Sequence, residues 1–203
     1  MVLLVATTNR DKLREIQSLL AEAPVELAVL GDLAPIEEPD ESGPTFQENA
    51  RLKALYYAGR AGMVTVAEDS GLSIDALHGE PGVRSARFLR PDASYPERFS
   101  EIFRQLAGHL GQDRAARFIC AVAVARGNTI LFETTGTVEG EIASSPRGVH
   151  GFGYDPIFYY PPYRSTLAEV TEEAKLLVAH RGKAFRALAD WLRGTPDLVR
   201  DSL

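Results

Sequence analysis

The chain opens with Val2-Leu-Leu-Val-Ala-Thr-Thr-Asn-Arg-Asp-Lys12, an apolar run that changes abruptly into polar residues. Val2–Ala6 has the length and composition of a buried strand. Apolar side chains then recur at helical spacing, at Leu13, Ile16 and Leu20. Thr8 or Asn9 can cap the helix that this spacing predicts. A buried strand that leads directly into a capped helix is typical of α/β proteins.

The segments that follow continue the alternation of predicted strands and helices. Pro24 to Pro44 predicts a strand followed by a long loop, and Thr45-Phe-Gln-Glu48 fits the capping box of a second helix. Met63–Ala67 predicts another buried strand, which we expect to end at Glu68-Asp-Ser-Gly71. Two further strands predict a hairpin, at Ala116–Ala125 and Thr129–Val138. Together these elements predict an α/β fold with a mixed sheet.

The remaining helix signals lie in the second half of the chain. Pro96–Leu110 predicts a helix, and Thr166-Leu-Ala-Glu169 is a second match to a capping box. A last helix is expected from about Lys183 to near Gly194. Because no repeat or long linker interrupts the chain, we expect residues 1–203 to form a single domain.

Composition excludes several classes of function. The net charge of −6 disfavours a nucleic-acid polymer as partner, although a local pocket can still bind a small anion. Cys120 is the only cysteine, so an intramolecular disulfide is excluded, and its apolar neighbours predict a buried, inert thiol. The longest apolar runs fall short of the about 20 residues of a membrane span, and the N-terminus lacks a basic signal region. We expect a cytoplasmic protein without a membrane partner.

The turn after the first strand is a candidate phosphate site. Backbone amides at a helix N-terminus attract phosphate, and hydroxyl, amide and ammonium groups add donors. The turn lacks the glycines of a Walker loop, and the alternative is an ordinary capped helix with a solvated lysine. The candidate residues are Thr7, Thr8, Asn9, Arg10, Asp11 and Lys12.

Two acidic pairs are candidate metal ligands. Mg²⁺ prefers hard oxygen ligands, usually one or two carboxylates completed by water and phosphate oxygens. Glu68-Asp69 follows a buried strand, where adjacent acids are costly unless something compensates them. Asp40-Glu41 lies in the long loop, where the alternative is a charged surface loop.

Two later segments are candidates for binding a base. Gly151-Phe-Gly-Tyr-Asp-Pro156 combines glycines, which allow close approach of the backbone, with a flat ring at Phe152. The alternative is a tight turn with its aromatic rings in the core. Lys175 can neutralise phosphate, and His180-Arg181 can donate to a carbonyl, although a histidine near a helix start is more often structural.

These blocks together resemble the inosine triphosphate pyrophosphatase family. The resemblance rests on blocks in the family's order, which are Ala6–Lys12, Thr45–Ala54, Glu68–Leu72, Pro81–Arg87, Gly151–Phe158 and His180–Gly182. It implies hydrolysis of deaminated purine nucleoside triphosphates to monophosphate and pyrophosphate, with magnesium as cofactor. It also implies an elongated mixed sheet with two lobes around an active-site cleft, usually in a homodimer.

The resemblance also implies roles for individual residues. Asp69 corresponds to the acid that binds magnesium and accepts a proton, and Asp40-Glu41 to a second metal-binding acid, with the choice between the two open. The turn Thr7 to Lys12 and Lys53 would bind the phosphates, and Ser70 would contact the substrate. The nucleoside would be held by Phe152, Gly153, Tyr154, Asp155, Lys175, His180 and Arg181.

Small departures from the family's motifs leave alternatives open. Ala179-His-Arg stands where Ser-His-Arg is usual, and Glu68 and Asp40 replace an aspartate and a glutamate. A pyrophosphatase with another base preference, such as modified pyrimidines, and a non-catalytic nucleotide-binding regulator are the two rival functions. The sequence does not show how guanine nucleotides would be excluded.

Overall fold

The computed structural model describes residues 1–109 and 111–195. Within them, seven strands join one sheet in the order β2-β1-β3-β4-β5-β6-β7. β1 runs parallel to β2 and β3, whereas β6 is antiparallel to β5 and β7. The strands are β1 (Val2–Val5), β2 (Glu26–Val29), β3 (Val64–Ile74), β4 (Ala115–Arg126), β5 (Thr129–Ile142), β6 (Phe158–Tyr160) and β7 (Ser165–Thr166). The predicted α/β class and mixed sheet are therefore confirmed.

The described residues divide into two compact units, each built from separate stretches of chain. Unit 1 comprises Met1–Asp69, Cys120–Gly136 and the chain from Arg181, and unit 2 comprises Ser70–Ile119 and Thr137–His180. The α-helices are α1 (Arg10–Leu19), α2 (Phe46–Ala61), α3 (Tyr95–Gln105), α4 (Glu172–Val178) and α5 (His180–Gly194). α1 and α2 belong to unit 1, and α3 and α4 belong to unit 2.

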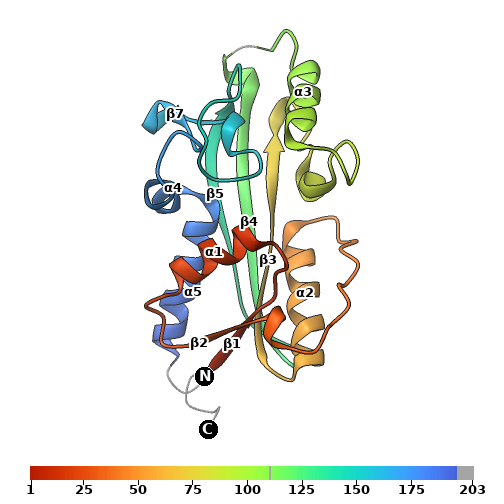
Figure 1. The fold of residues 1–203 in the computed structure, drawn as a ribbon, viewed down its shortest axis with the longest axis vertical. Helices are drawn as coiled ribbons and strands as arrows, with labels where there is room; N and C mark the ends of the chain where they lie inside the picture. The colour runs from red at the N-terminus through yellow and green to blue at the C-terminus, as the bar shows by residue number, and fades with distance from the viewer. Residues whose placement is uncertain (110, 196–203) are drawn as a thin grey trace. The chain divides into compact units, whose positions relative to one another are not determined.

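The core of unit 1 forms between its strands and the helix pair α1 and α5, which lie side by side (Figure 1). Alternate residues of each strand face these helices, because side chains along a strand point to opposite faces. α2 lies on the other side of the strands (Figure 1). The buried cluster consists of Leu3, Val5, Ile16, Leu20, Val64, Val66, Cys120, Val122, Val124, Ala184, Phe185, Leu188, Ala189 and Leu192.

Unit 2 has its own core, in which α3 packs against the strands and the loops that follow them (Figure 1). Aromatic rings supply much of this cluster, and Phe118 lies 4.5 Å from Phe158 between ring centroids. The buried cluster consists of Leu72, Ile74, Phe88, Phe99, Ile102, Leu106, Ala116, Phe118, Val138, Ile142, Tyr154, Ile157, Phe158 and Leu167.

The two predicted helix starts in unit 1 are confirmed. Asn9, and not Thr8, caps α1 through its side chain. Thr45 and Glu48 form the predicted capping box of α2: the Thr45 hydroxyl accepts from Glu48 N, and the Glu48 carboxylate accepts from Thr45 N. α2 ends at Gly62, whose φ of 64° lies in the left-handed region that favours glycine.

The predicted end of the third strand is wrong. β3 continues through Glu68-Asp-Ser-Gly71 to Ile74 instead of stopping at the acids. Both acidic side chains are buried, Glu68 at 3% exposure and Asp69 at 5%. The strand can accommodate them because cationic side chains compensate both carboxylates, as described below.

Three helix boundaries also differ from expectation. α5 begins at His180, before the expected Lys183. The pair Thr166 and Glu169 closes a turn and starts no helix: Glu169 Oε2 accepts from Thr166 N at 2.7 Å, and α4 begins later, after its cap Thr171. α3 ends at Gln105, whereas its expected last residue, Leu110, lies outside the described residues.

Two expectations about the chain as a whole are tested by burial and helix length. Cys120 is fully buried, and burial together with the nearby Glu68 charge raises the pKa of its thiol well above the ordinary value, which agrees with an inert thiol. In the part of the chain that the structure describes, no helix is long and apolar enough to cross a membrane.

Candidate active site

The turn between β1 and α1 is organised by the side chain of Asn9. Its Oδ1 accepts hydrogen bonds from the amides of Asp11 and Lys12, both at 3.0 Å. Two of the amides expected to attract phosphate are therefore already satisfied. Asp11 pairs at the surface with Arg14, at 3.0 Å, instead of facing a ligand. The exposed side chains that the turn offers to an anion are Thr8, Asn9 and Arg10.

Lys12 turns inward and contacts a buried group of charged side chains in unit 1. Its Nζ lies 2.7 Å from Glu68 Oε1. Arg181, at the start of α5, donates from NH1 to Glu15 Oε2 at 2.8 Å and lies 3.4 Å through NH2 from Glu68. Two carboxylates thus face two cations, so the group is balanced in charge. We call Lys12, Glu15, Glu68 and Arg181 the buried charge cluster.

The cluster keeps Glu68 and Arg181 ionised despite their burial. Burial by itself would raise the pKa of Glu68, but the charges of Arg181, Lys12 and Lys53 together hold that pKa well below its usual range. Burial likewise opposes the charge of Arg181, whereas the carboxylates of Glu68 and Glu15 hold its pKa above the ordinary value. Each charge therefore depends on the others.

Asp69 belongs to a second group, on the opposite face of β3, because adjacent strand residues point to opposite sides. Its Oδ2 accepts from Asn49 Nδ2 of α2 at 3.1 Å. Lys53, one helical turn further along α2, places Nζ 3.0 Å from Glu41 Oε1 and 3.9 Å from Asp69 Oδ1. Burial raises the pKa of Asp69, and the charge of Lys53 opposes that rise.

Glu41 and Asp69 are the residues that suit a hard divalent cation. Among the described residues, no group of three or more His, Cys, Asp or Glu side chains is placed to hold a metal ion. Mg²⁺ usually needs only one or two protein carboxylates, because water and phosphate oxygens complete its shell. Glu41 and Asp69 already converge on one cation, the Lys53 ammonium, whereas Asp40 is exposed. This pair therefore fits magnesium.

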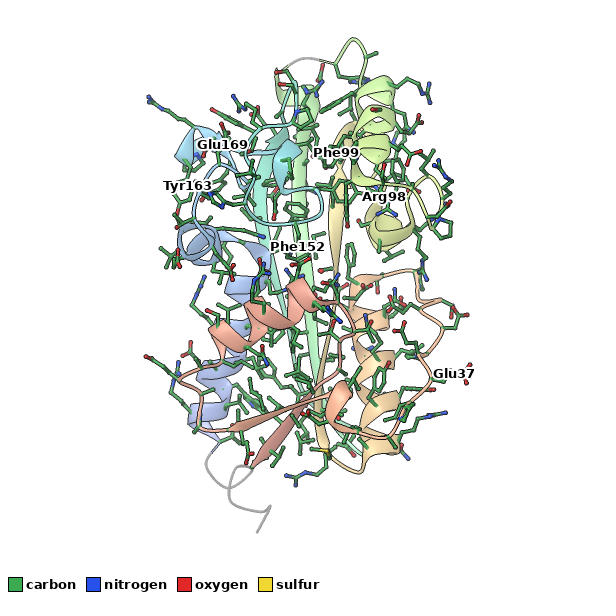
Figure 2. All side chains as sticks on the ribbon, in the orientation of Figure 1. Glu37, Arg98, Phe99, Phe152, Tyr163 and Glu169 are labelled. Atoms are coloured by element: carbon green, nitrogen blue, oxygen red, sulfur yellow. The ribbon has the colours of Figure 1, made fainter. Side chains whose placement is uncertain are left out.

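In unit 2, the segment Gly151 to Asp155 forms a tight turn closed by its own carboxylate. Asp155 Oδ2 accepts from Phe152 N at 2.8 Å and from Lys175 Nζ at 2.6 Å. The same ammonium lies 4.7 Å from the centroid of the half-buried Phe152 ring, which is labelled in Figure 2. Gly151 has a φ of 68°, and a Cβ there would come within 2.2 Å of Asp155 Oδ2, so only glycine fits.

Three other residues from the sequence prediction also lie in unit 2. His180 is buried and stacks on Phe118, with ring centroids 4.8 Å apart and planes 17° apart. Tyr154 is 4% exposed and donates its hydroxyl to Ser85 O at 2.8 Å, so its polar end is used inside the unit. Ser70 is half-buried in β3.

The structure therefore gathers eight of the predicted residues into three groups: Lys12 and Arg181 in the buried charge cluster, Glu41–Lys53–Asp69, and Phe152–Asp155–Lys175. Sequence reasoning did not single out Glu15 or Asn49, the hydrogen-bond partners of Arg181 and Asp69. A signal for Glu15 was present, because an acid directly precedes the core residue Ile16 on an amphipathic helix. Asn49 has no comparable signal in the sequence.

The chain matches the Ham1 family over residues 3–191, and it belongs to that family.

Individual relatives are similar to this chain over most of their length. A dITP/XTP pyrophosphatase of a Nostoc species is 47% identical over 92% of each chain. A dITP/XTP pyrophosphatase of Syntrophobacter fumaroxidans is 44% identical over 92% of this chain and 80% of the relative. Among solved structures, a HAM1 protein from Coxiella burnetii superimposes with a TM-score of 0.88 at 36% identity, covering 96% of this chain and 99% of the other.

The buried charge cluster predicts a sharp difference between two glutamates. Glu68→Gln leaves buried cations without full compensation and should lower the free energy of unfolding by about 3 kcal/mol or more. Glu133→Gln removes the partner of Arg51 in an exposed ion pair and should cost less than about 1 kcal/mol. Urea denaturation followed by circular dichroism measures both, and equal losses would contradict the account of the cluster.

Proposed function

We propose that the chain is a magnesium-dependent pyrophosphatase for deaminated purine nucleoside triphosphates, namely ITP, dITP and XTP. It would release the monophosphate and pyrophosphate and so remove these nucleotides from the pool. Relatives at 44% and 47% identity carry the name dITP/XTP pyrophosphatase. The observation that carries the proposal is the Lys53 ammonium between Glu41 and Asp69, which joins metal-binding oxygens to a phosphate-binding cation.

We assign the metal to Glu41 and Asp69, which decides between the two acids of the long loop in favour of Glu41. A bound magnesium ion would neutralise phosphate charge and lower the pKa of a coordinated water. Asn49 holds one oxygen of Asp69 at 3.1 Å and so orients the carboxylate. Glu41 is half-buried and pairs with Lys53, whereas Asp40 is exposed, which supports the assignment.

The other residues of unit 1 would position and neutralise the triphosphate. Lys12 and Lys53 supply positive charge, and the turn that contains Thr7, Thr8, Asn9 and Arg10 supplies polar side chains. Asp69 would accept a proton from the water that attacks the α-phosphorus in line, while pyrophosphate leaves. Such a transfer depends mostly on positioning and charge stabilisation.

Residues of unit 2 would hold the nucleoside. The Phe152 ring offers a face for base stacking, and Lys175, Asp155 and Ser70 offer polar contacts. Gly153 lets the backbone of the turn approach the ligand. We assign Tyr154 to the support of this turn and not to contact with substrate, because its hydroxyl is already bound to Ser85 O.

Selection against ATP follows from donors aimed at the 6-carbonyl of hypoxanthine or xanthine. We keep His180 and Arg181 as the proposed donors, since an amino group at that position would oppose them. Glu15 and Glu68 hold the guanidinium of Arg181 in a fixed orientation, which favours such selectivity. A site of this kind can discriminate by orders of magnitude.

Domain organisation, location and oligomeric state are part of the same proposal. We propose that residues 1–203 act as a single domain, although residues 110 and 196–203 lie outside the described part. We also propose a cytoplasmic homodimer. Its substrate is a free nucleotide and not a nucleic-acid polymer, in keeping with the net charge of −6.

A nucleotide panel tests the function. Pyrophosphate release should be fastest from ITP, dITP and XTP, and at least about a hundredfold slower from ATP, because unmatched polar groups in a binding site are strongly rejected. The measurement is pyrophosphate release per enzyme under identical conditions. A preference for modified pyrimidines would favour the first rival, and binding without release the second.

Two experiments test the metal ion and the proton acceptor. Chelator should abolish activity, and added magnesium should restore it. Asp69→Asn should lower kcat by about a hundredfold or more, because it removes both a metal ligand and the proton acceptor. Near-normal kcat in that variant would remove Asp69 from the reaction.

The two loop acids form a matched pair of variants. Glu41→Gln should raise the magnesium concentration needed for half-maximal activity by about tenfold or more, within the range seen when a metal site loses a supporting interaction. Asp40→Asn should leave it near the wild-type value, because Asp40 is exposed. A magnesium titration of pyrophosphate release measures both, and the reverse order would assign the metal to Asp40.

A further inference from the structure

Arg98 of α3 is buried in unit 2 in an unusual way. Its exposed fraction is 4%, and among the described residues its Nε has no hydrogen-bond partner. Its NH2 donates to Pro91 O at 3.3 Å, and its guanidinium carbon lies 5.0 Å from the centroid of the Tyr95 ring. Within the described chain, no ion pair involves Arg98. A guanidinium buried without a carboxylate is costly, so its remaining contacts must matter.

Those contacts lead to Tyr154, the inward-facing residue of the turn Gly151 to Asp155. Burial raises the pKa of the Tyr154 hydroxyl, and the adjacent positive charge of Arg98 opposes that rise. The Tyr154 ring meets Tyr95 edge to face, with centroids 5.3 Å apart and planes at 90°. Its hydroxyl donates to Ser85 O at 2.8 Å. Tyr154 is therefore held by two other stretches of chain, α3 and the segment at Ser85.

Tyr95 of α3 also lies close to Gly153 of the turn. Gly153 has a φ of 64°, and a Cβ built there would lie 3.5 Å from the Tyr95 hydroxyl. Tyr154 separates Phe152 from Asp155, and those two are joined by hydrogen bonds in both directions: Asp155 N donates to Phe152 O at 3.2 Å, and Phe152 N to Asp155 Oδ2. A shift of the Tyr154 ring must therefore move both residues.

We propose that Arg98 and Tyr95 are positioning residues for the nucleoside end of the substrate, acting through Tyr154. Arg98 contacts Pro91 and the Tyr95 ring, and Tyr95 in turn meets Tyr154, so Arg98 supports the rings beneath the turn Gly151 to Asp155. Arg98 and Phe99, its neighbour on α3, are labelled in Figure 2 together with Phe152. The inference rests on the proposed function, because it takes Phe152 and Asp155 as contacts of the nucleoside.

The test separates the nucleoside from the phosphates. In Arg98→Gln, KM for ITP should rise about tenfold with a much smaller change in kcat, because a misplaced binding turn weakens ligand positioning. Inhibition by inorganic tripolyphosphate, which has no nucleoside, should keep its wild-type constant. Arg98→Lys retains the charge but not the planar guanidinium. Its KM for ITP should lie between those of wild type and Arg98→Gln. Arg104→Gln, on the same helix but exposed and paired with Glu101, is the matched control and should behave as wild type.

Hydrogen exchange gives a readout that does not need activity. Peptides that cover Gly151 to Asp155 should exchange faster in Arg98→Gln than in wild type, with no change in Arg104→Gln. An unchanged KM for ITP, an equal weakening of tripolyphosphate, or unchanged exchange in the turn would overturn the proposal. If wild type released no pyrophosphate from any nucleotide, the proposed function would fail, and exchange in the turn would still decide the role of Arg98.

Discussion

Two adjacent acids in the middle of a buried strand are the constraint on which the candidate site depends. A strand sends neighbouring side chains to opposite faces, so Glu68 and Asp69 cannot share one set of partners. Glu68 meets Lys12 and Arg181 on the side of α1 and α5, and Asp69 meets Asn49 and Lys53 on the side of α2. Removing either set would leave an uncompensated buried carboxylate.

Because their partners differ, the pKa values of Glu68 and Asp69 shift in opposite directions. Glu68 is surrounded by cations that hold its pKa well below the usual range, which keeps it ionised and unsuited to accepting a proton. Asp69 is shielded from water with weaker compensation, so its pKa is raised. Two carboxylates next to each other in sequence thereby differ in how readily they bind a proton.

Unit 2 also buries a carboxylate, with fewer charged partners than in unit 1. Asp155 is buried, and it is satisfied by the Lys175 ammonium and by an amide of its own turn. Beneath that turn, aromatic rings and a single buried guanidinium replace ion pairs. Such a floor has few alternative arrangements, which suits a turn that must present a ring and a carboxylate in one geometry.

Local sequence determined the first strand, the start of α2 and the turn at Gly151. The strand before Thr7 is signalled by its own apolar run. The capping box at Thr45 and the turn at Gly151 are short-range signals because their hydrogen bonds join residues a few positions apart. The continuation of β3 through its acids was not predictable locally, since the compensating cations come from α1, α2 and α5. The pairing of Glu15 with Arg181, 166 positions apart, was likewise decided only by tertiary packing. Partners so distant in sequence are brought together by the burial of the surrounding core, and a local pattern carries no record of that.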